Sequence, residues 1–84
     1  MTDSPEITLY GATWCGASRR ARLLLDSHSI PYRWIDIELD EEGARTVALL
    51  NHGNRRVPTL VWADGSMLVE PTNEQLTEKL KISL

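Results

Sequence analysis

The stretch that decides the fold is Thr13–Ser18, with the sequence Thr-Trp-Cys-Gly-Ala-Ser. It holds the only cysteine of the chain, Cys15, and it lies where the apolar run Ile7–Tyr10 gives way to a helical pattern. That pattern consists of small and apolar side chains at helical spacing: Ala17, Ala21, Leu24 and Leu25. We therefore expect Cys15 at or just before the first turn of a helix, where backbone N–H groups have no partner within the helix.

A cysteine in that position is suited to thiol chemistry. The N-terminus of a helix favours negative charge, so it stabilises a thiolate over a thiol. The thiolate is the nucleophile of thiol–disulfide exchange, and a half-exposed sulfur on such a turn is accessible to the sulfur of another molecule. A small, buried, apolar cysteine is the commoner case in general, but the residues that flank Cys15 argue against it.

Those flanking residues resemble the glutaredoxins. Cys15–Arg22 (Cys-Gly-Ala-Ser-Arg-Arg-Ala-Arg) is similar to the Cys-x-x-Cys/Ser-x-Arg-Ala-Lys segment of that family, and Arg55–Thr59 (Arg-Arg-Val-Pro-Thr) is similar to its Thr-Val-Pro loop. The resemblance extends from Ile7 to about Leu80. Three segments look most like the mycoredoxins, which act on low-molecular-weight thiols other than glutathione: Trp14–Gly16, Gly53–Arg55 and Asp64–Ser66.

The order of elements expected from the residues is β-α-β-α-β-β-α. The expected strands are Ile7–Tyr10, Tyr32–Leu39, Thr59–Trp62 and Met67–Val69. The first helix runs from about Gly16 to Ser27 or Ser29. Because two strands joined by such a helix form a right-handed parallel crossover, Cys15 is placed above the carboxyl end of the first strand. The resemblance implies the same arrangement, a thioredoxin-like (glutaredoxin) α/β fold with a four-stranded mixed sheet and three helices.

Finer signals mark where these elements begin, end and pack. The second strand alternates up to Leu39, with Ile35, Ile37 and Leu39 on one face. The second helix has acidic residues in its first turn and is expected to pack through Ala44, Val47, Ala48 and Leu50. Asp-Gly between the last two strands predicts a hairpin. Thr72 and Gln75 form a capping-box pattern, and the last helix is expected to pack through Leu76, Leu80 and Leu84.

Length and composition limit the classes of function. The 84 residues are expected to form one domain, residues 1–84, which apolar packing must stabilise, because one cysteine cannot form an internal disulfide. A net charge of −3 with mixed signs gives no strong field for nucleic acid or membrane. We find no targeting pattern and no apolar run long enough to span a bilayer. The protein is therefore expected to be soluble and cytoplasmic, in a compartment where thiols stay reduced.

The resemblance also implies which residues bind the substrate. In the family the proline that corresponds to Pro58 is cis, and it turns the backbone of Val57 toward the active cysteine, so that this backbone pairs with an extended thiol substrate. Trp14 is expected to form an apolar wall of the thiol groove. Gly16 and Ala17, in the same motif as the cysteine, are also expected to contact the substrate.

Ser18 stands where many glutaredoxins have a second cysteine. A hydroxyl cannot close an internal disulfide and expel the first partner, so the chain as it stands is monothiol. The sequence leaves two origins open, a natural Cys-x-x-Ser member or a replacement of a resolving cysteine. In both cases Ser18 is expected to donate a hydrogen bond to the thiolate of Cys15.

Two departures from the family pattern concern recognition of the thiol. Ala12 stands where many glutaredoxins have a lysine that pairs with a glutathione carboxylate, and Val69–Asn73 replaces a Gly-Gly-Cys-Asp-Asp-like run. Thr72 and Asn73 still bring a hydroxyl, an amide and free N–H groups to a helix start, where a polar or anionic headgroup can be received. Thr72 is also the expected N-cap of that helix.

These observations predict a thiol–disulfide oxidoreductase with Cys15 and Ser18 in its catalytic centre. Its co-substrate would be mycothiol, bacillithiol or glutathione, and its partners would be this thiol and thiolated proteins. We expect a monomer with no bound cofactor or metal. The alternative is an iron–sulfur cluster carrier, since Cys-Gly-Ala-Ser differs by one residue from the Cys-Gly-Phe-Ser of monothiol glutaredoxins. Against it, those proteins have a Trp-Pro-Thr loop where this chain has Val57–Thr59.

Overall fold

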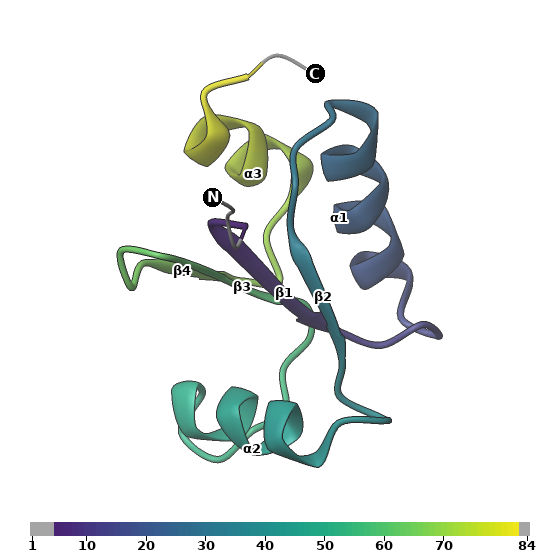
Figure 1. The fold of residues 1–84 in the computed structure, drawn as a ribbon, viewed down its shortest axis with the longest axis vertical. Coiled ribbons are helices and arrows are strands. Elements are labelled where there is room, and N and C mark those ends of the chain that lie inside the picture. The colour runs from purple at the N-terminus through teal and green to yellow at the C-terminus, as the bar shows by residue number, and fades with distance from the viewer. Residues whose placement is uncertain (1–4, 83–84) are drawn as a thin grey trace.

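The computed structural model of the chain describes residues 5–82. Its elements follow the predicted order β-α-β-α-β-β-α (Figure 1). The strands are β1 (Ile7–Gly11), β2 (Arg33–Asp36), β3 (Thr59–Trp62) and β4 (Met67–Val69), and the helices are α1 (Gly16–Ser27), α2 (Glu41–Leu50) and α3 (Asn73–Leu80). None of these helices combines the length and the apolar character needed to cross a bilayer.

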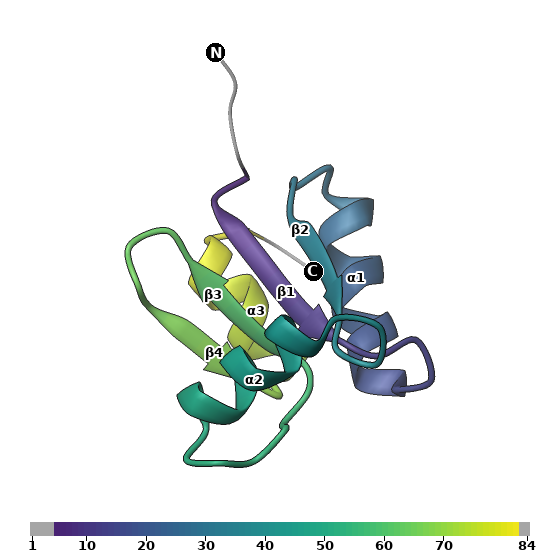
Figure 2. The ribbon, with the colours of Figure 1, turned by 60° about the horizontal axis from the view of Figure 1, so that its bottom comes forward.

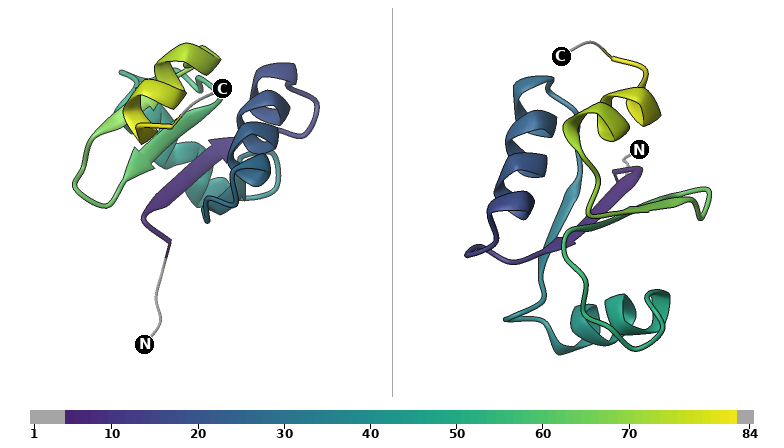
Figure 3. Two further views of the ribbon diagram at one scale, coloured as in Figure 1. Left: turned by 90° about the horizontal axis from the view of Figure 1, so that it is seen from above. Right: turned by 180° about the vertical axis from the view of Figure 1, so that it is seen from behind.

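The four strands form one mixed sheet with the order β2-β1-β3-β4. β1 pairs parallel with β2, whereas the β1–β3 and β3–β4 pairs are antiparallel. α1 and α3 cover one face of the sheet and α2 lies against the other (Figures 1 and 2). The view from behind shows the same division (Figure 3). The predicted thioredoxin-like α/β fold is therefore confirmed.

The main hydrophobic core lies between the sheet and the α1/α3 pair. Its buried members come from two strands, β1 and β3, and two helices, α1 and α3: Ile7, Leu9, Ala21, Leu24, Leu25, Leu60, Trp62 and Leu76. Alternation along β1 explains the two faces, because Ile7 and Leu9 belong to this core while Tyr10 packs toward α2. The α2 face has a smaller cluster of Ile37, Ala44 and Val47. The site described below lies between these two packed regions.

The second strand is shorter than predicted, because it ends at Asp36 and not at Leu39. The Asp36 carboxylate accepts a hydrogen bond from the N–H of Glu38 at 2.9 Å, and the Asp36 carbonyl accepts from the N–H groups of Leu39 and Asp40, both at 3.0 Å. These local bonds turn the chain out of the sheet. Leu39 is 87% exposed, so the prediction that it lies on the buried face with Ile35 and Ile37 is wrong.

The helix ends follow the predicted capping chemistry. The Thr72 hydroxyl accepts a hydrogen bond from the N–H of Gln75 at 3.1 Å, and the Gln75 side chain accepts from the N–H of Thr72 at 2.9 Å. Leu76 is buried as predicted, and Leu80 packs against the main core, whereas Leu84 lies outside the described residues. On α2, Leu50 is 39% exposed, so its predicted packing role is wrong: it falls on the solvent side of the helix.

Candidate active site

Cys15 is the N-cap residue of α1 and follows the short turn that leaves β1. Its N–H donates to the carbonyl of Ala12 at 3.1 Å, and its own carbonyl accepts from the N–H of Arg19 at 3.0 Å. Its backbone is extended (φ −84°, ψ 118°), as is usual for an N-cap. The sulfur is therefore held at the free N–H groups of the helix, as the sequence predicts.

The first turn of α1 packs unusually closely on the end of β1. A Cβ atom at Gly11 would lie 2.7 Å from the Ser18 Oγ and 2.8 Å from the ring of Trp34. Only glycine leaves room for this approach. As a result, the start of α1, which carries Cys15, is packed directly against the end of β1.

Ser18 is completely buried behind the cysteine. Its Oγ accepts a hydrogen bond from the N–H of Ala12 at 3.3 Å. A serine hydroxyl accepts and donates at once, so the hydroxyl hydrogen is available for another acceptor. The predicted bond to the Cys15 thiolate is therefore compatible with the position of Ser18.

The pKa of Cys15 lies below its ordinary value. Partial burial of the sulfur raises the pKa, but hydrogen bonding from the Ser18 hydroxyl and from the N–H groups of Ser18 and Ala17 lowers it by more. The Glu70 carboxylate opposes this and raises the pKa. The result agrees with a thiolate stabilised by a helix start.

Two of the three arginines that follow the cysteine interact with other groups. Arg19 donates to the carbonyl of Thr13 at 2.8 Å, and the guanidinium of Arg22 lies over the ring of Trp34, 4.1 Å from its centroid. Arg20 is exposed. The arginines therefore lie on the surface of the helix. The lowered pKa of Cys15 is due to the hydrogen-bond donors of Ser18 and Ala17 and not to these arginines.

The structure brings the loop at Val57 and Pro58 against the cysteine. The peptide bond between these two residues is cis, and the Cys15 Sγ lies 3.9 Å from the Val57 carbonyl oxygen, within range for a weak S–H hydrogen bond. The Val57 side chain packs against the α2-face cluster, and Pro58 is buried. Four of the predicted site residues, Cys15, Ser18, Val57 and Pro58, are therefore gathered in one place.

Three other predicted residues lie on the exposed side of the cysteine. Trp14, the residue before the cysteine, is 66% exposed. Gly16 is exposed, and a Cβ placed on it would meet no atom within 4 Å. Ala17 is half-buried. This side of Cys15 is open to an approaching substrate.

Thr72 and Asn73 lie at the start of α3, in the segment that follows Glu70. That segment reaches the site because the Glu70 N–H donates to the Pro58 carbonyl at 2.7 Å. Part of the predicted binding capacity of Thr72 is used by the capping box, which occupies its N–H and an acceptor position of its hydroxyl. Asn73, the first residue of α3, keeps an N–H that has no partner within the helix.

Sequence reasoning missed two charged residues next to the loop. Arg56 Nε lies 2.8 Å from the Glu70 Oε2, so that an ion pair links the residue before Val57 to the residue after β4. Glu70 has a positive φ of 50°. One signal in the sequence could have revealed Glu70. It stands in Val69–Asn73 where the similar run of the family has a glycine, the residue that adopts a positive φ most readily.

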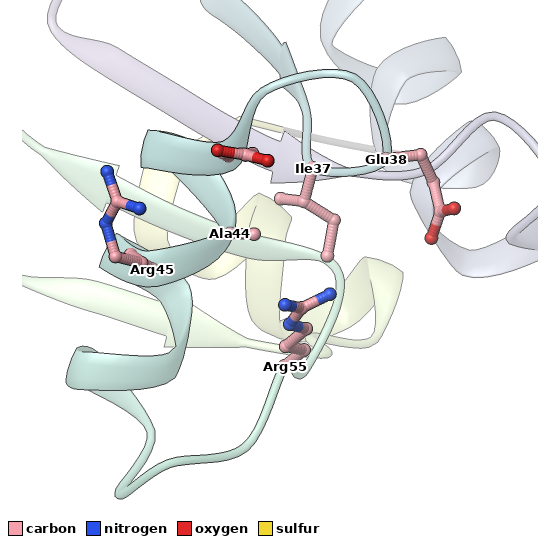
Figure 4. Close-up of a pocket in the computed structure, with 6 residues that line it drawn as sticks. Ile37, Glu38, Ala44, Arg45 and Arg55 are labelled. Atoms are coloured by element: carbon pink, nitrogen blue, oxygen red, sulfur yellow. The ribbon is translucent and has the colours of Figure 1, made fainter.

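A pocket of about 390 Å³, which the sequence also did not reveal, opens on the α2 side of the loop (Figure 4). Its lining consists of Ile37, Glu38, Glu41, Ala44, Arg45 and Arg55. The pocket adjoins the site through the cluster in which Ile37 and Ala44 pack with Val57. Two arginines and two glutamates make the pocket polar.

Within residues 5–82, histidine, cysteine, aspartate and glutamate side chains form no group of three or more that could hold a metal ion.

Known proteins with similar sequences are glutaredoxins and mycoredoxins. The Glutaredoxin family model matches residues 7–67. A Mycobacterium tuberculosis protein whose name assigns it to the glutaredoxins is 39% identical over 74 residues, which cover 88% of each chain. Mycoredoxin 1 of Corynebacterium glutamicum is 33% identical over 75 residues, which cover 89% of this chain and 92% of that one.

Solved structures support the fold. The crystal structure of a glutaredoxin from Archaeoglobus fulgidus superposes with a TM-score of 0.74 at 22% identity, covering 92% of this chain and 87% of that one. A thioredoxin-like protein, in the form of a point mutant, superposes with a TM-score of 0.77 at 22% identity, covering 93% and 97%. Together with the sequence matches, they show that the chain belongs to the glutaredoxin family, near its mycoredoxin branch, and is a thiol–disulfide oxidoreductase of that family.

Proposed function

We propose that the protein reduces mixed disulfides between proteins and a low-molecular-weight thiol, by a monothiol mechanism through Cys15. The Cys15 thiolate attacks the small-thiol sulfur of the mixed disulfide, and the S–S bond to the protein breaks, so that the protein leaves as a thiolate. Cys15 is then joined to the small thiol. A second small thiol, as its thiolate, attacks that sulfur, frees Cys15 and leaves as part of the oxidised small-thiol dimer.

The observation that carries this proposal is the surroundings of the Cys15 sulfur. It has first-turn donors on one side, the Val57 carbonyl 3.9 Å away on another, and open space beside Gly16. The buried residue three positions on is Ser18, a hydroxyl that donates to a thiolate but cannot form a disulfide. In this proposal Cys15 is the nucleophile and Ser18 stabilises its thiolate.

The remaining predicted residues would form the substrate groove. Trp14, Gly16 and Ala17 would contact the thiol on the open side, and the Val57–Pro58 backbone would pair with its peptide-like part. Thr72 and Asn73 would receive its polar headgroup at the start of α3.

The polar pocket with Arg45 and Arg55 is a second place where polar substituents of the substrate can bind. We propose mycothiol, bacillithiol or glutathione as the co-substrate. The name of the corynebacterial relative favours testing mycothiol first.

Intact mass spectrometry tests the mechanism directly. The protein is incubated separately with oxidised mycothiol, bacillithiol and glutathione. We expect one adduct per chain, persisting until a free thiol is added, and the fastest adduct identifies the preferred thiol. Cys15→Ser should form no adduct. An adduct that leaves without any external thiol would contradict the mechanism.

Ser18→Cys is the complementary variant. A second thiol at this position should expel the adduct and close a disulfide with Cys15, which is read as the loss of two hydrogens from the intact mass. A persistent adduct in Ser18→Cys would show that the helix start does not bring the two side chains together, and the assignment of Ser18 to the catalytic centre would fail.

The iron–sulfur carrier is not favoured, because the sequence relatives at 33% and 39% identity are named mycoredoxin and glutaredoxin.

The proposal also includes the domain organisation, the oligomeric state and the location. The chain acts as a single domain over residues 1–84, as a monomer, and in the cytoplasm, where the thiol pool stays reduced.

A further inference from the structure

An ion pair borders the proposed thiol groove. Glu70 donates its N–H to the Pro58 carbonyl at 2.7 Å and accepts from Arg56 Nε through its Oε2 at 2.8 Å. Arg56 and Pro58 flank Val57, whose carbonyl lies 3.9 Å from the Cys15 sulfur. Glu70 and Arg56 are therefore tied to the same loop that contacts the nucleophile.

Both charged side chains reach solvent at this border. The Arg56 side chain is 54% exposed and that of Glu70 is 46% exposed. Because about half of each side chain is exposed, the pair is not a buried salt bridge. Since both residues are tied to the loop that contacts Cys15, a disulfide that reaches this sulfur brings its substituents toward these charges.

We propose that Glu70 is a specificity-determining residue, whose carboxylate disfavours oxidised thiols with negative charge close to the disulfide and favours those that are neutral or cationic there. Arg56 partly neutralises this effect. The inference rests on the proposed disulfide exchange at Cys15 and adds which substrates are preferred.

The electrostatics of the cysteine supports the proposal independently. The Glu70 carboxylate raises the pKa of Cys15, which means that it repels negative charge at the sulfur. A substituent two carbon atoms from the reacting sulfur lies in nearly the same region, so it experiences repulsion of the same sign. Since the groups are exposed, this repulsion is moderate and sensitive to salt.

Three symmetric disulfides with equal two-carbon arms provide the probe: cystamine, 2-hydroxyethyl disulfide and 3,3′-dithiodipropionate. Each reaction forms a disulfide between Cys15 and one half of the probe, and the other half leaves as a thiolate. The measured quantity is the rate of adduct formation at low ionic strength. The ratio of the cystamine rate to the dithiodipropionate rate cancels the fraction of Cys15 that is ionised, because the nucleophile is the same in both reactions.

The variants are Glu70→Gln, Arg56→Gln and, as a control with the same change of net charge, Glu78→Gln on the exposed side of α3. We expect Glu70→Gln to lower the cystamine-to-dithiodipropionate ratio by about fivefold, the size expected for a charge within several ångströms in water. Arg56→Gln should raise the ratio and Glu78→Gln should leave it near that of the original chain. About 0.5 M KCl should remove most of the difference.

The outcomes separate the two levels of the proposal. If Glu70→Gln leaves the ratio unchanged, or if Glu78→Gln lowers it equally, Glu70 does not select substrates by charge and the inference is overturned. If the original chain forms an adduct with none of the three probes, the proposed exchange at Cys15 is itself overturned, and the inference falls with it.

Discussion

The two faces of the sheet are built differently. The face under α1 and α3 has a continuous buried core from β1, β3 and both helices, whereas the face under α2 has a small cluster next to a polar pocket. Cys15 and Ser18 belong to the first face, and the Val57 side chain belongs to the second. The helix that carries Cys15 therefore packs on the larger core, and the smaller cluster packs against the side chain of Val57.

The largest expected difference between the faces is in stability. Leu25→Ala and Ile37→Ala remove the same number of carbon atoms, one from each core. Leu25 is completely buried, so we expect a loss of about 4 kcal/mol, because the surrounding side chains cannot fill the cavity. Ile37 lines the pocket, where water can replace the lost atoms, and we expect about 2 kcal/mol. Urea unfolding measures both values, and equal costs would remove the distinction between the faces.

The next largest effect concerns how tightly the site is joined to the first face. Gly11→Ala places a methyl group 2.7 Å from the Ser18 Oγ, and the contact must relax at a cost of about 1–3 kcal/mol. The displaced Ser18 should also weaken its hydrogen bond to the cysteine. Gly16→Ala is the matched control, since a methyl group there meets open space and should change the free energy of unfolding by less than about 0.5 kcal/mol. Equal effects of the two substitutions would mean that the close packing does not hold the helix start.

Local sequence signals predicted the elements and their ends well. The Asp-Gly turn of the β3–β4 hairpin and the Thr72–Gln75 capping box depend on residues within four positions of one another, so the sequence contains the whole interaction. The second strand shows where such reading fails. Alternation continues through Leu39, but the side chain of Asp36 bonds its own downstream backbone and ends the strand.

The residues of the candidate site that share one motif could be predicted from the sequence, whereas the contacts between distant segments could not. Cys15 and Ser18 share a helix start, and the family resemblance supplied Val57 and Pro58. The ion pair joins residues 14 positions apart, and the two pocket arginines are placed by the packing of α2 against the loop. These pairings depend on how β4 and α2 are positioned in space, which no local pattern in the chain contains.

The smallest expected effect is a change in the pKa of Cys15. This change tests whether the reactivity of the thiol depends on Ser18, which is buried on α1. Ser18→Ala removes the hydroxyl that lowers the pKa of Cys15, so the pKa should rise toward its ordinary value. The variant also leaves the Ala12 N–H without its acceptor, at a cost of roughly 1 kcal/mol. Ser27→Ala, at the far end of α1, is the control: it loses a bond to the Leu24 carbonyl and should leave the thiol unchanged.

The direction of the pH dependence follows from the lowered pKa. Because Cys15 ionises more readily in the folded than in the unfolded chain, its ionisation stabilises the fold above the unfolded pKa, and this contribution is lost as the pH falls through the folded pKa. Thiolate absorbance should therefore show a lower midpoint in the original chain than in Ser18→Ala. Adduct rates should differ most at pH values below both midpoints, where the original chain has the larger ionised fraction, and should converge above both. A midpoint that Ser18→Ala leaves in place would show that the first-turn N–H groups alone stabilise the thiolate, and that burial of Ser18 against Gly11 serves packing only.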